Sequence, residues 1–225
     1  MTAVAKGEIR MVELILMNKS LDINVCDPES GVNAFWLACL YGRGNIMKLL
    51  AEKGINIYVT NQNKINVLHL AVLKNHAEIV KMLLKSNFPL DHETDEGMTA
   101  LHLAAQLSHT EIADIILSHL IDESQYKTSY ILEIISKVNS KSNLSPLALA
   151  ILIGNKEIAK KLIISGSKSY YDDNAQQKDL SPIFLACEKE QSDLLELMCD
   201  HGAELTVQNT SGQTPLMFSS QQQKM

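Results

Sequence analysis

Histidine and cysteine are the side chains in this sequence that could hold a metal ion or act as nucleophiles. The 225 residues include seven His and four Cys. None of them shows the His-x₃-His or Cys-x₂-Cys spacing from which protein zinc sites are usually built. We therefore expect no metal site and no bound cofactor.

A nucleophilic cysteine would need a nearby base that stabilises its thiolate. Cys39 and Cys187 each follow an Ala inside an apolar segment, where a packed thiol is expected instead. The glycines within 42–45 follow a helical pattern rather than a strand, which excludes the phosphate-binding loop of dinucleotide-binding folds. Asp and Glu are scattered singly through the chain. The sequence therefore indicates no catalytic residue, and we interpret the protein as a non-enzyme.

Charge and hydropathy restrict the partners and the location. The formal net charge is −6, whereas a nucleic-acid surface needs clustered Lys and Arg to neutralise phosphates. No apolar run reaches the roughly 18 residues of a membrane span, so direct membrane insertion is not expected. The four Cys lack a disulfide framework, which favours reduced, mostly packed thiols. We expect a cytoplasmic protein, with cytoskeletal association or a nuclear location left open.

The elements that position these side chains recur along the chain. Each copy opens on Asn, Ser or Thr, side chains that accept hydrogen bonds from free amides at a helix start. These markers are Asn33, Asn66, Thr99, Ser145, Ser181 and Thr214, at steps of 33, 33, 46, 36 and 33 residues. Leu and Ala stand four and five residues after each of the first five markers. The Ala permits close approach of neighbouring helices, so we expect a helix pair after each of these five markers.

The segments TALHLAA (99–105), VLHLAV (67–72), NHAEIVKMLL (75–84) and GNKEIAKKLI (154–163) resemble the ankyrin repeat. The resemblance covers nearly the whole chain. It implies an all-α fold, an ankyrin-repeat solenoid of stacked helix-turn-helix units with projecting hairpin-like turns, in a single domain over 1–225. His69 and His102 lie in the marker motif, where we expect the imidazole to bond to nearby turn backbone. The family typically binds proteins and has no chemistry of its own.

The repeat pattern is incomplete at both ends and interrupted once. A half-repeat precedes the first marker over 1–26, and a partial last repeat starts at Thr214. Their apolar residues lead us to expect that further repeats or a partner cover the ends. An insertion of 13 residues lies within 119–143. There, Ile131, Ile134, Ile135 and Val138 fall on one face of a helix expected over 128–138. This face either packs on its own solenoid or serves as a docking element.

The remaining candidate site is a protein-binding concave face, because the family places its variable positions there. Residues directly before the markers include Val32, Ile65, Met98 and Leu144, and about half of such residues are expected to pack between turns instead. Seven and eight residues past the markers stand Leu40, Tyr41, Leu73, Lys74, Leu107, Leu152 and Ile153. Large apolar patches are uncommon on monomers, so this strip predicts contact with one or more proteins.

Two classes of function fit this sequence. The first is a non-catalytic protein–protein interaction module, an adaptor or scaffold subunit that binds partners along its concave face and turns. The second is a regulatory ankyrin segment of a larger enzyme, channel or transcription regulator whose activity lies outside this chain. A purely architectural subunit, locked permanently into an assembly, is a third interpretation. The sequence does not identify the partner.

Overall fold

The computed structural model describes residues 1–18, 20–122, 126–171 and 178–222. Within these ranges all the regular structure is helical, with an isolated antiparallel bridge between Thr60 and Asn66. The chain divides into two compact units, Met1–Ala100 and Leu101–Met225. Each unit is built from helices that pack in pairs. The all-α class expected from the sequence is therefore confirmed.

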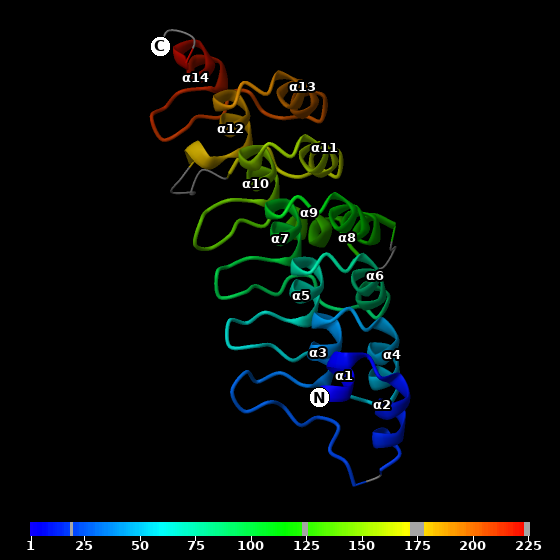
Figure 1. Ribbon diagram of the computed structural model, residues 1–225. Coiled ribbons are helices and arrows are strands. Elements are labelled where there is room, and N and C mark those ends of the chain that lie inside the picture. The colour runs from blue at the N-terminus through cyan, green and yellow to red at the C-terminus, as the bar shows by residue number, and fades with distance from the viewer. Residues whose placement is uncertain (19, 123–125, 172–177, 223–225) are drawn as a thin grey trace. The chain divides into compact units, whose positions relative to one another are not determined.

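The first unit contains three helix pairs and the turns between them. Its helices are α1 (Thr2–Lys6), α2 (Ile9–Leu16), α3 (Ala34–Leu40), α4 (Gly44–Glu52), α5 (Val67–Leu73) and α6 (Ala77–Lys85). In Figure 1, α1, α3 and α5 form one column and α2, α4 and α6 form another, with the turns projecting from the first column. This is the stacking that the repeat pattern predicts.

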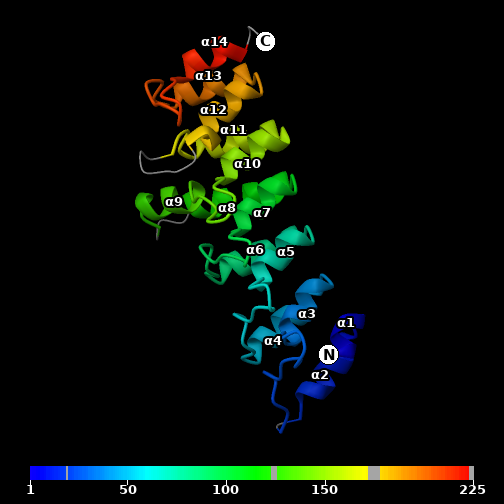
Figure 2. The same ribbon diagram turned by 90° about the vertical axis from the view of Figure 1, so that its left-hand side faces the viewer.

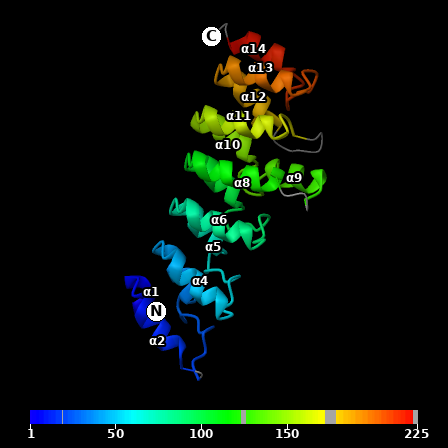
Figure 3. The same cartoon turned by 90° about the vertical axis from the view of Figure 1, so that its right-hand side faces the viewer.

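The second unit repeats the same arrangement. It contains α7 (Ala100–Gln106), α8 (Thr110–Asp122), α9 (Thr128–Ile135), α10 (Pro146–Ile153), α11 (Lys156–Ile164), the 3₁₀ helix η1 (Lys178–Leu180), α12 (Pro182–Glu188), α13 (Ser192–Asp200) and α14 (Pro215–Gln222). Helix α11 packs against both α8 and α13, which form one column in Figure 3. Helix α10 packs against α12, and α12 against α14. A helix pair follows each of the first five markers, as expected.

Most markers cap the helix that they precede. The Asn33 side chain accepts hydrogen bonds from the amides of Phe35 and Trp36 at 3.0 and 3.2 Å. The Ser145 hydroxyl accepts from the Ala148 amide at 3.2 Å, with Pro at the first helical position. Such a cap stabilises a helix by roughly 1 kcal/mol relative to Ala. Ser181 differs, because its hydroxyl accepts the Tyr171 amide of the preceding turn at 3.1 Å instead.

The core lies between the helices of each stack. The Ala five residues past each marker has no exposed surface; these residues are Ala38, Ala71, Ala104, Ala150 and Ala186. The residue two past each marker is an apolar side chain that is at most 2 % exposed; these residues are Phe35, Leu68, Leu101, Leu147 and Ile183. Each buried Leu, Ile or Phe side chain contributes about 1.5–3 kcal/mol. The Ala of the sequence pattern therefore lies on the packed face in all five repeats, and the Leu before it is buried in four of them and half-buried at Leu37.

Two buried histidines connect a helix to the turn of the following repeat. In the first unit, the Nδ1 atom of His69 accepts the Asn66 amide at 3.4 Å, and its Nε2–H donates to the carbonyl of His92 at 3.1 Å. In the second unit, Nε2 of His102 lies 3.2 Å from the carbonyl oxygen of Leu144. Both imidazoles bond to turn backbone, as predicted from their place in the motif.

The half-repeat expected over 1–26 contains two helices, of which the first is short. Helix α1 has five residues, whereas α3 and α5 have seven. Backbone hydrogen bonds fix the equivalence between these helices. The amides of Gly7 and Glu8 donate to the carbonyls of Val4 and Ala3, respectively. In the same way, the amides of Gly42 and Arg43 donate to the carbonyls of Cys39 and Ala38. Helix α1 is therefore equivalent to the C-terminal part of α3.

The insertion forms α9, which Figures 1 and 2 show beside α8. The helix ends at Ile135 rather than at 138 as expected. Its C-terminal end is attached to the following repeat, because the Ser167 hydroxyl donates to the Ile135 carbonyl at 3.3 Å and the Lys168 amide donates to the Ser136 hydroxyl at 2.9 Å. Residues 123–125 of the insertion lie outside the described part. The interpretation in which α9 packs on its own stack is supported.

Candidate protein-contact surface

The C-terminal ends of the first helices place apolar side chains on the surface. In the first unit, Tyr41 is the C-cap residue of α3 and is 48 % exposed. Leu40 and Leu73 beside the helix ends are half-buried, and Lys74, the C-cap residue of α5, is exposed. Tyr41 is therefore the main apolar contact candidate among the predicted positions of this unit.

The second unit presents a more apolar surface at the equivalent positions. Leu107 follows α7 and is 40 % exposed, while Leu152 and Ile153 end α10 and are 36 % and 47 % exposed. The bond from His102 to Leu144 joins α7 to the turn that leads into α10. At the end of α12 the same positions hold Glu188 and Lys189, whose charged atoms lie 3.5 Å apart. We call Leu107, Leu152 and Ile153 the helix-end patch.

The residues directly before the markers contribute less than predicted. Val32 and Met98 are 3 % and 8 % exposed, so we remove both from the contact surface. Val32 is held inside its turn, where its carbonyl accepts the Asp27 amide at 2.8 Å. The carbonyl of Met98 accepts the Thr94 amide at 3.0 Å in the same way. Ile65 and Leu144 are half-buried and stay at the edge of the candidate surface.

The insertion has a smaller free surface than the docking interpretation requires. Ile134 and Ile135 are 1 % and 0 % exposed, so they belong to the core and are excluded from a docking face. Ile131 is half-buried and Val138 is 37 % exposed. Leu132, which the sequence analysis did not select, is 38 % exposed. Of the four residues on the predicted face, two pack inward, Ile131 is at its edge, and Val138 lies beyond the end of α9.

The buried cysteines and the buried His69 are held in their uncharged forms. Burial raises the pKa of the Cys39 thiol to about 12 and also raises that of Cys187, so both stay protonated. Burial lowers the pKa of His69 to about 4, with a smaller contribution from the nearby His92. Cys26 and Cys199 are exposed, so only half of the thiols are packed, fewer than expected. Among the residues that the structure describes, no three His, Cys, Asp or Glu side chains are placed to share a metal ion.

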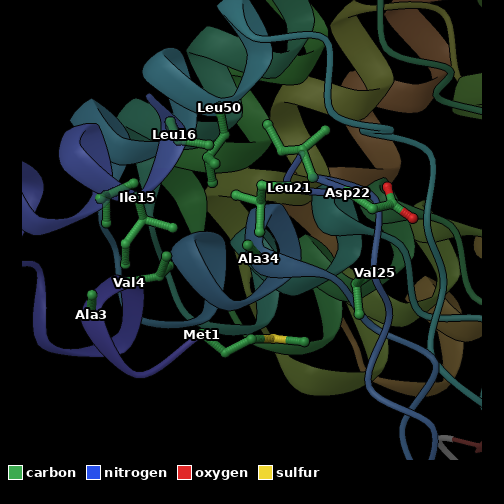
Figure 4. Close-up of a pocket in the computed structure, with 12 residues that line it drawn as sticks. Met1, Ala3, Val4, Ile15, Leu16, Leu21, Asp22, Val25, Ala34 and Leu50 are labelled. Atoms are coloured by element: carbon green, nitrogen blue, oxygen red, sulfur yellow. The ribbon is translucent and has the colours of Figure 1, made fainter. Parts of the chain in front are cut away.

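Sequence reasoning missed an apolar pocket of about 270 Å³ in the first unit. Figure 4 shows its lining residues, which come from Met1 and α1, from α2, from the segment 21–25, and from one residue each of α3 (Ala34) and α4 (Leu50). Asp22 is the one charged residue of the lining. The sequence signal for this pocket was the presence of apolar residues on both faces of α2, such as Leu14 and Ile15, which are 62 % and 44 % exposed.

In the described ranges, no helix has the length and apolar character needed to cross a membrane.

Comparison with known proteins identifies the family. A family model of ankyrin repeats (three copies) matches residues 1–90, 56–129, 89–172 and 147–225. No curated protein sequence matches significantly. The crystal structure of the ankyrin repeat domain of Bcl-3, described as a unique member of the IkappaB protein family, has a TM-score of 0.79 with 19 % identity over 96 % of this chain and 91 % of that one. The human ASB11 ankyrin repeat domain has a TM-score of 0.66 with 20 % identity over 96 % and 89 %. These neighbours confirm the ankyrin-repeat solenoid as the fold, and from the family match we conclude that the chain belongs to the ankyrin-repeat family.

Proposed function

We propose that this chain is a non-catalytic adaptor or scaffold module that binds a partner protein through the helix-end patch. The observation that carries this proposal is the exposure of Leu107, Leu152 and Ile153 at 36–47 %, at the ends of helices whose other apolar residues are almost fully buried. An exposed Leu or Ile gives the monomer little stability, but it contributes about 1.5–3 kcal/mol when a partner covers it. Ankyrin repeats generally bind proteins, which agrees with this surface. The free thiols are compatible with a reducing compartment, so we extend the proposal to a cytoplasmic location.

The test introduces negative charges into the helix-end patch. Leu107→Glu with Ile153→Glu is expected to leave the thermal midpoint almost unchanged and to weaken partner binding at least about 100-fold, because two apolar contacts are lost and two charges are buried. Ile164→Glu is the matched control, since Ile164 is 61 % exposed on α11 and lies outside the patch. The measurement pairs melting curves with crosslinking mass spectrometry, from a photo-crosslinker at position 152 of the patch, in the native complex.

Each result has a distinct meaning for the proposal. Loss of crosslinks in the double variant but not in Ile164→Glu supports the patch as the binding surface. Unfolding of the double variant would show that these residues belong to the core. Undiminished crosslinking to the same partner would place the contact on the turns or on α9 instead. Aggregation of the isolated chain during gel filtration would favour a permanent architectural subunit.

A further inference from the structure

Ion pairs join the second helices of successive repeats in the second unit. Lys161 of α11 pairs with Asp114 of α8. On the other side of α11, the ammonium groups of Lys156 and Lys160 lie 2.8 and 3.5 Å from the carboxylate oxygens of Asp193 on α13. In both of these helix–helix seams, the chain itself therefore supplies a carboxylate to the lysines of the neighbouring helix.

The second helices α4 and α6 of the first unit are separated by a cleft of about 520 Å³. Figure 3 shows the two helices one after the other in the same column. Lys48 of α4 lines one wall of the cleft, and Lys81 and Lys85 of α6 line the other. Glu78 is the one acidic side chain among the described residues of the lining. Positive charge therefore predominates in this cleft, although the net charge of the protein is −6.

Glu78 does not neutralise the lysines of both walls. It stands twelve residues past its marker, as Asp193 does in its own repeat, but its carboxylate accepts a hydrogen bond from Lys81 of the same helix at 2.7 Å. This bond lowers the pKa of Glu78, with smaller contributions from Lys85 and Lys48. Among the residues that the structure describes, neither Lys48 nor Lys85 forms an ion pair. The cleft therefore lacks the bridging carboxylate that each seam of α11 contains.

The dimensions of the cleft suit an extended peptide. Its volume is that of a site for a ligand of several groups rather than for one small ion. Lys81 and Lys85 are four residues apart on α6, which is about 6 Å along the helix axis. Side chains at i and i+2 of an extended chain lie on one side at a similar spacing of about 6.6 Å. The lining also includes Ile79, which is 4 % exposed, and the half-buried Met82, so an apolar floor is available to the carbon atoms of an acidic side chain.

We propose that the cleft between α4 and α6 binds an extended segment of a partner protein that carries Asp or Glu at alternate positions. The carboxylates of this segment lie between Lys48 on one wall and Lys81 and Lys85 on the other, where they accept charge-assisted hydrogen bonds. Binding also relieves the repulsion among three like charges. The site lies in the first unit and uses no residue of the helix-end patch. Failure of its test is therefore distinguishable from failure of the proposed function.

The first experiment titrates acetyl-Glu-Thr-Glu amide into the full chain and follows backbone amide signals by NMR. The peptide is expected to shift the signals of Asn45 and Lys48 with a dissociation constant on the order of 1 mM in about 20 mM salt, and to bind at least about 3-fold more weakly in about 150 mM salt. Lys48→Gln with Lys85→Gln should weaken binding at least about 10-fold, because two of the three cationic donors are lost. Lys53→Gln with Lys6→Gln is the matched control, since these lysines are exposed, lie outside the cleft and remove the same charge.

The second experiment supplies the carboxylate from within the chain. Asn45 is exposed and lines the cleft, so Asn45→Asp should weaken peptide binding at least about 3-fold, whereas Asn45→Ser should leave it unchanged. Equal binding by these two variants, equal binding of acetyl-Gln-Thr-Gln amide, or binding that the Lys48 and Lys85 double variant retains would overturn the proposal. Inorganic phosphate that produces the same shifts at a lower concentration would also overturn it, by assigning the cleft to phosphate. A concentration-dependent dimer lost in the double variant would overturn it by assigning the cleft to a second copy of this chain.

Discussion

At the scale of single residues, burial separates side chains of the same type into two roles. Leu101 and Leu107 both belong to the third marker's segment, yet they are 1 % and 40 % exposed. The first fills the space between helices, whereas the second lies at the solvent edge. The residue type alone does not set the role, because the number of residues between the Leu and its marker decides whether it is buried or exposed.

Replacing these two leucines by Ala should give very different losses of stability. Leu101→Ala leaves a cavity in the core and should cost roughly 2–5 kcal/mol. Leu107→Ala should cost at most about 0.5 kcal/mol, as is usual for surface changes. Urea unfolding of both variants, followed by circular dichroism, measures the difference. Similar losses for the two variants would mean that the face assignment in the second unit is inverted.

The buried His69 should make the first unit sensitive to acid. Its pKa of about 4 lies below the value of 6.5 for a free imidazole. The unfolded chain therefore binds a proton between pH 6.5 and 4 while the folded chain does not, so stability is complete above pH 6.5 and falls as the pH drops toward 4, by up to roughly 3 kcal/mol. His69→Gln should flatten this slope while its side chain still accepts the Asn66 amide. Urea unfolding at pH 7 and pH 4.5 measures the effect, and equal slopes for both proteins would contradict it.

Residue roles that depend on local sequence could be predicted, and those that depend on distant contacts could not. The caps at Asn33 and Ser145 follow from helix-start chemistry within three residues. Ser181 was expected to act in the same way, but its hydroxyl accepts the amide of Tyr171, which lies ten residues earlier in the chain. Val32 and Met98 were also placed by phase alone, and closure of their turns buries them.

At the scale of elements, α9 is held by both its side chains and its backbone. Ile134 and Ile135 are buried, and the following repeat bonds to the end of the helix through Ser167 and Lys168. The length of the insertion and its helical period were visible in the sequence. The sequence did not show whether the apolar face packs on its own solenoid or docks on a partner, because the helical period is the same in both cases.

Truncation of the buried face of α9 should destabilise the second unit. Ile134→Ala is expected to cost roughly 2–4 kcal/mol and to speed amide exchange in α8, which packs against α9. Val138→Ala, at a position 37 % exposed, should change stability by less than about 0.5 kcal/mol. Hydrogen exchange with mass spectrometry resolves both effects by segment. Unchanged exchange in α8 after Ile134→Ala would show that α9 packs without supporting the stack.

At the scale of the whole molecule, the step of 33 residues predicted the class of fold, because a helix pair of this length cannot bury its apolar faces alone. The pattern could not predict how well each pair is packed. That depends on how many of the pair's side chains its neighbours cover. Helix α6 has four buried residues, Ile79, Val80, Leu83 and Leu84, whereas α2 of similar length has only Val12.

This difference predicts uneven stability within the first unit. Local opening requires less free energy where fewer apolar side chains are buried, so amides of α2 should exchange at least about 100-fold faster than those of α6. The gap follows from three fewer buried side chains at about 1.5–3 kcal/mol each, of which only part is lost in a local opening. Hydrogen exchange measured by NMR at a single pH gives both rates in one sample. Equal protection of α2 and α6 would show that the first unit opens as one cooperative block.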